Sequence, residues 1–501
     1  MVRSLKSLKV TLSRVVRGSA LASEAEEKKS WKGFASRIPK AIVVIGVVMV
    51  VVAGMEHLGW FRGFETSHLD TLIRLRSGEM SKKIVIVEIS EEDYQRRFDG
   101  TSPLDKWKLL GLLRAVQKYN PRVIGVDIDT NDWHAACRRG QGGAQCAQQC
   151  AEFDKALGEL RAAAEPNPEA GNSGTTIVWA AVPRTLDPPL ELNPGLGSLP
   201  LGWDWQGIPR FPVDEDGSVR HFDGRVEVKK SGDECPRGAD KVGEACYLPT
   251  FARAIVEAFR HKPRITADEQ VVFNFHGDRY QFPIIDAKQF FPEQVANEKR
   301  SKEEIASENE AIEQSRVGQF ADKVVLIGGG FPEARDEYFT PRGSMQGVEL
   351  NALAIQTDLD GGGIHDFTRG CELLIDFAVS LLIVGMFYLY EQRPWKAVGM
   401  SFLVVPAAFV SSLVLFNSLA YWFNFIPVAA GVFIHQLYEL AEGGSEAREK
   451  LRELQHEQEP VEVDVATVEE VTVAENAQAD ATEETLSVEN AKAKRAASGA
   501  D

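Results

Sequence analysis

The chain has 501 residues, 44% of them hydrophobic and 26% charged, with a formal net charge of -17 at pH 7. A nucleic-acid partner is excluded on electrostatic grounds, because the long segment 59–370 contains no strongly basic stretch. The charge is unevenly distributed: residues 441–501 hold 16 acidic and 6 basic side chains, whereas residues 1–40 hold 3 acidic and 10 basic ones.

The chain begins with a basic arm, residues 1–37. Within residues 1–20, Leu and Val side chains recur at helical spacing with Lys and Arg between them. Two interpretations stay open. One is a basic amphipathic helix on the anionic inner leaflet of the membrane, and the other is an irregular arm that only sets the topology.

Four apolar runs have the length expected of membrane spans, because a helix needs roughly 20 residues to cross about 30 Å of hydrocarbon. We predict transmembrane helices at residues 38–58, 371–390, 397–416 and 419–440. The first run is too long, and too far from the start of the chain, for a cleaved signal peptide. A buried hairpin of a soluble core is the alternative for the last three, but soluble helices seldom run this long without a polar stripe.

The positive charges predict the orientation. Basic residues that flank spans stay in the cytoplasm, so the arm places the N-terminus inside. Four spans then return the C-terminus to the same side. Residues 59–370 are consequently predicted to lie outside the cytoplasm, and the chain to be a multi-pass protein of a bacterial inner membrane in contact with its lipid.

Residues 59–370 alternate between strand and helix patterns. Residues 83–89, 123–128, 176–181, 270–275 and 323–327 are rich in β-branched residues and predict strands, and residues 64–76 and 107–118 predict amphipathic helices. A short helical link between two strands favours parallel pairing. We therefore expect an α/β domain with a mostly parallel sheet.

Acidic residues stand at the carboxyl ends of the predicted strands, where open α/β sheets bind ligands. Glu88, Asp127, Asp129 and Asp336 are the candidates for lining such a cleft. Asp127 and Asp129 would face the same way if the strand continues through them. The alternative is that these carboxylates only cap the next helix or turn. Residues 328–330 are three glycines, but no Lys-Ser or Lys-Thr follows them, which argues against a phosphate loop.

Five of the six cysteines lie in the outer segment, where an oxidising compartment allows disulfides. Cys235 and Cys246 bracket a polar loop and suit a loop-closing bridge. Cys137 can pair with Cys146 or Cys150, which leaves one thiol over. The spacings expected of a zinc site are missing, so no metal and no other cofactor is predicted.

Several motifs resemble the type-two CHASE family, the cyclase/histidine-kinase-associated sensory extracellular domains of bacterial receptors. Residues 64–76 resemble its post-anchor Glu…Asp-x-x-x-Arg-x-Arg helix, and residues 214–220 resemble its Asp-x-Asp-Gly-x-x-Arg loop. Asp336, Thr340-Pro341 and the Gly-Val-Glu segment at 347–349 resemble its closing cluster. The resemblance implies a sensor domain at 59–370 and adds Asp216 and Arg220 to the candidate ligand-binding residues.

The chain departs from the family pattern at two places. The family's tryptophan-proline-rich turn is here only residues 102–105, and its usual His in the Gly-Val-Glu helix is Asn351. Family members commonly carry a cyclase, kinase or phosphatase after the last span, whereas residues 441–501 have an acidic composition typical of disorder. We therefore expect no catalytic output domain.

Three functions are consistent with the sequence. The first is a receptor that binds an unknown extracytoplasmic ligand and signals through a separate cytoplasmic or membrane partner, alone or as a homodimer. The second is a structural or assembly component of the cell envelope. The third is an outer-domain hydrolase that uses Glu88, Asp127 or Asp129. No nucleophile or metal spacing accompanies these acids, so we expect no enzyme and assign no catalytic residues.

Overall fold

The structure is a computed structural model that describes residues 39, 42–76, 82–130, 143–165, 174–185, 188–191, 205–230, 234–236, 239–261, 270–275, 282–291, 316–334, 336–390 and 394–457. The basic arm at residues 1–37 and most of residues 441–501 lie outside these ranges, so the predictions for them stay untested. The chain divides into two compact units, Met1–Val432 and Phe433–Asp501.

A six-stranded parallel sheet forms the centre of the first unit and confirms the prediction of an α/β domain with a mostly parallel sheet. Its order is β10-β1-β11-β2-β3-β4, and every neighbouring pair runs parallel. The strands are β1 (Ile84–Ile89), β2 (Val123–Asp127), β3 (Thr176–Ala180), β4 (Gln206–Gly207), β10 (Ile284–Asp286) and β11 (Val324–Gly329). Four of the five predicted strands lie here, and β4 and β10 are short additions at the edges.

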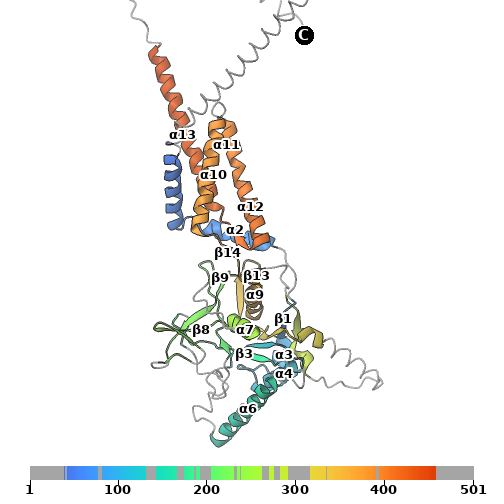
Figure 1. Ribbon diagram of the computed structural model, residues 1–501. Helices are drawn as coiled ribbons and strands as arrows, with labels where there is room; N and C mark the ends of the chain where they lie inside the picture. Colours follow the sequence, from blue (N-terminus) through green and yellow to red (C-terminus); the bar gives the residue numbers. More distant parts are fainter. Residues whose placement is uncertain are drawn as a thin grey trace, which may run out of the picture. The chain divides into compact units, whose positions relative to one another are not determined.

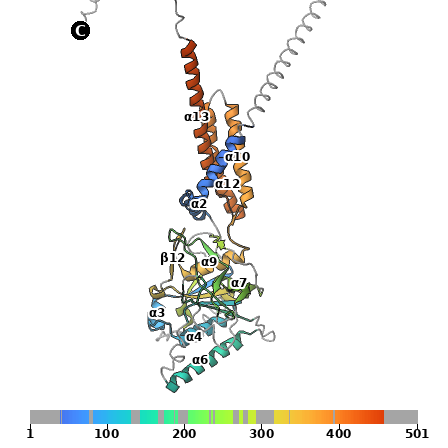
Figure 2. The same ribbon diagram turned by 90° about the vertical axis from the view of Figure 1, so that its left-hand side faces the viewer.

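Helices cover both faces of this sheet, because its central strands are apolar on both sides. In β1, Ile84 and Ile86 face one helix layer, whereas Val85 and Val87 face the other. The first layer holds α2 (Arg62–Leu75), α7 (Phe251–Arg260) and α9 (Gly347–Leu359), and the second holds α3 (Glu91–Arg97), α4 (Lys106–Gln117) and α6 (Gly143–Ala164). Figures 1 and 2 show α7 and α9 on the opposite side of the strands from α4 and α6.

Smaller sheets and turns extend the domain beyond the central sheet. The predicted strand at 270–275 is shorter than expected and lies outside the main sheet, because β9 (Gln270–Val272) pairs antiparallel with β5 (His221–Asp223). The others are β6 (Arg225–Val228), β8 (Ala245–Pro249) and β7 (Asp240–Val242) in one sheet, the hairpin of β12 (Glu337–Thr340) and β13 (Gly343–Gln346), and the 3-10 helices η3 (Ala287–Phe290) and η4 (Pro332–Ala334).

The disulfide predicted between Cys235 and Cys246 is present and links the segment before β7 to β8. Cys246 is buried in a small apolar cluster with Val226, Val228 and Leu248. Cys150 is also disulfide-bonded, but Cys137 lies outside the described residues, so the predicted pairing among Cys137, Cys146 and Cys150 is not resolved.

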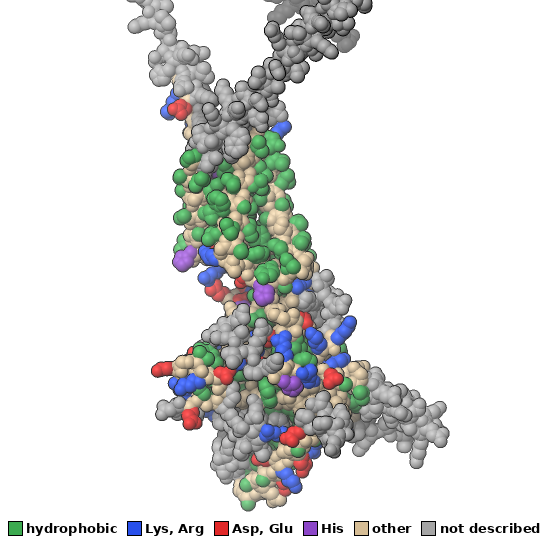
Figure 3. Space-filling model, viewed as in Figure 1, with side chains coloured by type: hydrophobic (Ala, Val, Ile, Leu, Met, Phe, Trp, Pro, Cys, Tyr) green, Lys and Arg blue, Asp and Glu red, His purple; other side chains and the backbone are tan. Residues whose placement is uncertain are grey.

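Two helices in the described part of the chain are long and apolar enough to cross a membrane, Arg369–Leu389 and Trp395–Leu419. The first is α10, and the second joins α11 (Pro394–Phe402) to α12 (Val404–Leu419). Hydrophobic side chains cover the surface of these helices, as Figure 3 shows, and charged side chains gather over the α/β domain. The predicted spans at 371–390 and 397–416 match them.

The other two predicted spans differ from the prediction. The helix Ile42–His57 covers most of the predicted span 38–58, of which residues 38, 40 and 41 lie outside the described residues. It meets α2 at an angle of 83°, and the two helices reach the length and hydropathy of a span only when they are counted together. The chain at 420–425 is not helical: it contains β15 (Tyr421–Trp422), and α13 (Ile426–Glu457) begins afterwards. Only Ile426–Tyr438 of α13 is apolar, which is shorter than the predicted 419–440.

Candidate functional site

The strand register places two of the predicted acids side by side at the carboxyl edge of the sheet. Gly328 of β11 pairs with Glu88 of β1 on one side and with Asp127 of β2 on the other. Side chains on paired residues point to the same face, which here is the face of α7 and α9. Gly328 stands between the two acidic residues, so no side chain separates their carboxylates. Val348 of α9 packs on the main chain of Gly328.

Asp127 and Asp336 form a coupled acid pair in this region. Asn351 of α9 donates a hydrogen bond of 2.7 Å from Nδ2 to Oδ2 of Asp127. Burial, and after it the charge of Asp336, raise the pKa of Asp127 from 3.8 to about 7, and the Asn351 hydrogen bond opposes this shift. Burial also raises the pKa of Asp336, whereas a hydrogen bond with Tyr338 lowers it. The pair therefore holds a proton near neutral pH.

Glycines allow the carboxylates of Glu88 and Asp336 to lie directly on the main chain. A Cβ at Gly330 would stand 1.7 Å from Oε1 of Glu88, and one at Gly347 would stand 1.9 Å from Oδ2 of Asp336. Burial raises the pKa of Glu88, and a hydrogen bond with Gln346 opposes this shift. The glycines at 328–330 thus serve close packing of Val348, Phe331 and Glu88.

The remaining predicted residues lie apart from Glu88, Asp127 and Asp336, which we call the acidic row. Strand β2 ends at Asp127, so the condition for Asp127 and Asp129 to face the same way is not met, and Asp129 is exposed in the loop that follows. Asp216 and Arg220 form a separate cluster around the Arg220 guanidinium. The structure thus brings Glu88, Asp127 and Asp336 to one edge of the sheet and leaves Asp129, Asp216 and Arg220 apart from them. That these residues bind a ligand stays a prediction.

The Arg220 side chain is 4% exposed and uses all five of its N–H donors on three carboxylates. It binds Asp70 of α2 through two bonds of 2.8 and 3.0 Å. It also binds Asp214 at 2.7 Å, and Asp216 at 2.6 and 2.9 Å. The Arg220 hydrogen bonds lower the pKa of Asp216 to about 2. This cluster fastens α2 to the α/β domain.

The end of α2 is held by the β12–β13 hairpin. Nη2 of Arg342 donates to the main-chain oxygens of Ile73 at 2.7 Å and Arg76 at 2.6 Å. In return, Nε of Arg74 donates to the main-chain oxygen of Pro341 at 2.8 Å. Arg342 thus donates to carbonyl groups at the end of α2, where the helix leaves carbonyl groups without intrahelical partners. The hairpin carries the Thr340-Pro341 motif, so that motif holds α2 in place.

The opposite side of α2 contacts the segment formed by α12 and the chain that follows it. His68 Nε2 lies 3.3 Å from Oγ of Ser412, which donates at 2.6 Å to the main-chain oxygen of Phe423. Asn424 donates a 2.7 Å hydrogen bond to Glu65. We name these contacts, together with the Arg220 cluster, the α2 junction. One helix is thereby bonded to the α/β domain on one side and to membrane-length helices on the other.

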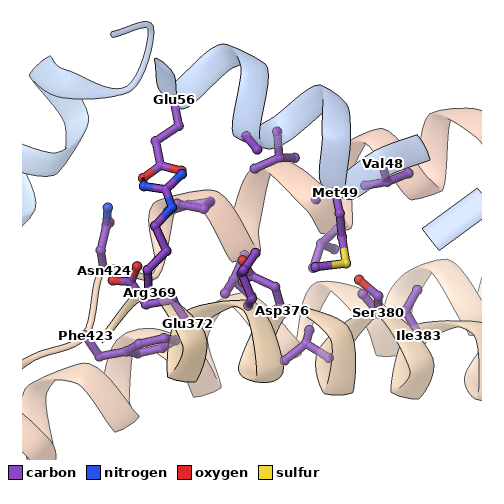
Figure 4. A pocket seen from close by; sticks show the side chains of 18 residues that line it. Val48, Met49, Glu56, Arg369, Glu372, Asp376, Ser380, Ile383, Phe423 and Asn424 are labelled. Carbon is purple, nitrogen blue, oxygen red and sulfur yellow. Dashed lines mark hydrogen bonds and ion pairs between the residues drawn. The ribbon is translucent and has the colours of Figure 1, made fainter. Parts of the chain in front are cut away.

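A small cavity of about 50 Å³ lies between the Ile42–His57 helix, α10 and the start of α13. Glu56 and Arg369 form an ion pair of 3.4 Å at this cavity, and Glu372, Asp376 and Ser380 line it from α10 (Figure 4). Carboxyl groups within apolar spans usually face the interior of a helix bundle, as these do. Among the described residues, no three or more His, Cys, Asp or Glu side chains group in a way that could hold a metal ion.

The fold and the α2 junction define a membrane-associated α/β module. A family model described as CHASE2 domain matches residues 47–387, and the chain belongs to this family. The match confirms the resemblance that the motifs indicated. No curated protein matches the chain, and no solved structure matches it.

Several residues of the site were not singled out from the sequence. Tyr338 contacts the acid pair, and Asp70 and His68 provide contacts of α2. Asn351 was noted only as a departure from the family pattern, and it donates to Asp127. Asp70 and Arg220 belong to two separate motifs of the family resemblance. Because 150 residues separate Asp70 from Arg220, no local pattern links them. The presence of both family motifs in one chain was the sequence signal for this ion pair.

Replacing Asp127 with Asn should remove a pH dependence of stability. The folded state holds a proton on Asp127 more tightly than the unfolded chain does, so wild-type stability falls as pH rises from about 4 to about 7. The neutral amide avoids this loss. Thermal unfolding of the full chain in detergent should show a gain for Asp127→Asn at about pH 8 and little change at about pH 4. Asp129→Asn is the exposed control, and an equal gain in both variants would contradict the assignment.

Replacing Arg220 with Ala should destabilise the α/β domain, because three carboxylates lose their shared cation. Removing one partner of a buried ion pair costs about 3 kcal/mol or more. Arg96→Ala, which breaks an exposed pair with Glu92, should cost less than about 1 kcal/mol. Thermal unfolding midpoints of the two variants measure the difference. Similar midpoints would show that the Arg220 cluster does not hold the fold.

Proposed function

We propose that this protein is an extracytoplasmic sensor of the inner membrane that passes the state of its CHASE2 domain to a separate partner. The observation that supports this proposal is the α2 junction. Asp70 binds the α/β domain through Arg220, while His68 and Glu65 contact the helical segment beyond α12. A shift of the domain therefore displaces a helix that is bonded to both parts.

A second connection supports the same route. Strand β14 (His365–Asp366) pairs in parallel with β15, which lies between α12 and α13. The main-chain nitrogen of His365 also donates to the main-chain oxygen of Ala420 at 2.8 Å. Because α10 begins three residues after β14, at Arg369, movement of this strand acts on α10 and on the α12–α13 connection together.

We further propose that the chain crosses the membrane four times. Arg369–Leu389 and Trp395–Leu419 have the required length, and Ile42–His57 and Ile426–Tyr438 provide shorter apolar helices. The bend after His57 excludes α2 from the first span on physical grounds, since α2 carries Arg62, Glu65 and Asp70 in ion pairs and hydrogen bonds. The basic residues at 1–40 support an N-terminus on the cytoplasmic side.

The four-span arrangement predicts that residue 230 lies outside the cytoplasm. Alkaline phosphatase, which is active only in an oxidising compartment, should be active when inserted after Lys230. The same reporter fused after Asp501 should be inactive, and a cytoplasmic fluorescent reporter should give the reverse pattern. Phosphatase activity at the C-terminus alone would reject the arrangement.

The partner is expected to bind the acidic C-terminal segment. Deleting residues 458–501 from the full chain should remove the partners recovered after crosslinking and quantitative mass spectrometry, while the protein stays in the membrane fraction. A variant with the same segment in scrambled order controls for charge alone. Partners that survive the deletion and belong to the envelope machinery would instead support the assembly function.

A further inference from the structure

A cavity of about 290 Å³ lies at the end of the α/β domain, beside β9 and the segment that leads into β14. Phe222 of β5 and Val271 and Val272 of β9 form one wall, and the segment Gly361–Asp366 forms another. Its volume is close to the lower end for pockets that hold small molecules, about 300 Å³. None of the three residues of the acidic row, Glu88, Asp127 and Asp336, lines this cavity.

The inner wall of the cavity contains a buried ion pair. Nη1 of Arg253, on α7, lies 2.9 Å from Oδ2 of Asp358, on α9, and the two side chains are 4% and 3% exposed. A buried ion pair is a weak source of stability, because desolvation offsets most of the attraction. Here it presents a positive and a negative group to the same polar space.

The outer wall is made of main chain and two polar side chains. Gly361 and Gly362 have φ values of +108° and +129°, which favour glycine, and a Cβ at Gly363 would stand 2.0 Å from the main-chain oxygen of Val272. This tight turn brings His365 and Asp366 to the edge of the cavity. Both are exposed, so a ligand can reach them from solvent.

The charges of the lining restrict the chemistry of a ligand. One guanidinium, two carboxylates and an imidazole face the cavity from α7, α9 and β14. A simple anion would be repelled by Asp358 and Asp366, and a simple cation by Arg253. An apolar ligand would displace the water that hydrogen-bonds to these groups, and it would offer no hydrogen bonds in return. A molecule that carries both an ammonium and a carboxylate group complements both signs.

We propose that this cavity binds a small zwitterion of the α-amino-acid class, with its carboxylate toward Arg253 and its ammonium toward Asp366. The inference rests on the proposed sensor function and names the class of its ligand. His365 and Asp366 are the residues of β14 that pair with Tyr421 and Trp422, so a ligand held by Asp366 acts on the strand that leads into α10.

Binding is tested by calorimetry on the full chain in lipid nanodiscs, with the twenty L-amino acids as probes. Propionate, ethylamine and glycerol serve as the anionic, cationic and neutral comparisons. At least one amino acid should bind with a Kd below about 1 mM, and the three comparison molecules should not. No binding by any amino acid, or equal binding by one of the comparison molecules, would overturn the proposal.

Two variants locate the binding in this cavity. Asp366→Asn removes the ammonium partner without changing size and should weaken binding at least tenfold, and Gln270→Trp should obstruct the cavity at its exposed edge. Glu244→Gln, in the exposed β7–β8 turn, should bind as wild type. Unchanged affinity in the first two variants would place the ligand elsewhere. If binding fails while partners are still lost on deleting residues 458–501, the ligand class is wrong and the sensor function stands.

Discussion

The structure depends on the ion pair between Arg220 and Asp70. It joins a loop of the α/β domain to the helix that follows the first apolar helix, across 150 residues of sequence. A guanidinium has five donors in a planar fork, and here every one of them meets a carboxylate oxygen. Lysine at this position would supply neither the geometry nor the number of hydrogen bonds, so the cluster specifies arginine.

The acidic row at the sheet edge has a different origin. It follows from strand register, which sets Glu88, Gly328 and Asp127 on three neighbouring strands. The glycines beside the row leave room for carboxylates to approach the main chain. Because Asp127 and Asp336 share a buried environment, their protonation is coupled.

The central strands were predictable because their signal is local. Residues such as Val85, Val87, Val325 and Ile327 form β-branched or aliphatic runs that fit only a buried strand. Helix α7 was missed because only Thr250 separates it from β8, so two elements merge into one apolar stretch. The grouping of Asp216 and Arg220 with Asp70 depends on a tertiary contact, and no pattern within either segment indicates it. The predicted end of the first span, at residue 58, lies next to the bend at Gly59, where φ is +73°.

The parallel ladder between β14 and β15 is only two residues long. So short a ladder contributes little free energy, and local opening is cheapest where few hydrogen bonds must break. The α2 contacts, by comparison, include a fully bonded guanidinium. Of the two connections between the α/β domain and the helices that follow it, the β14–β15 ladder is therefore the one that costs less free energy to open.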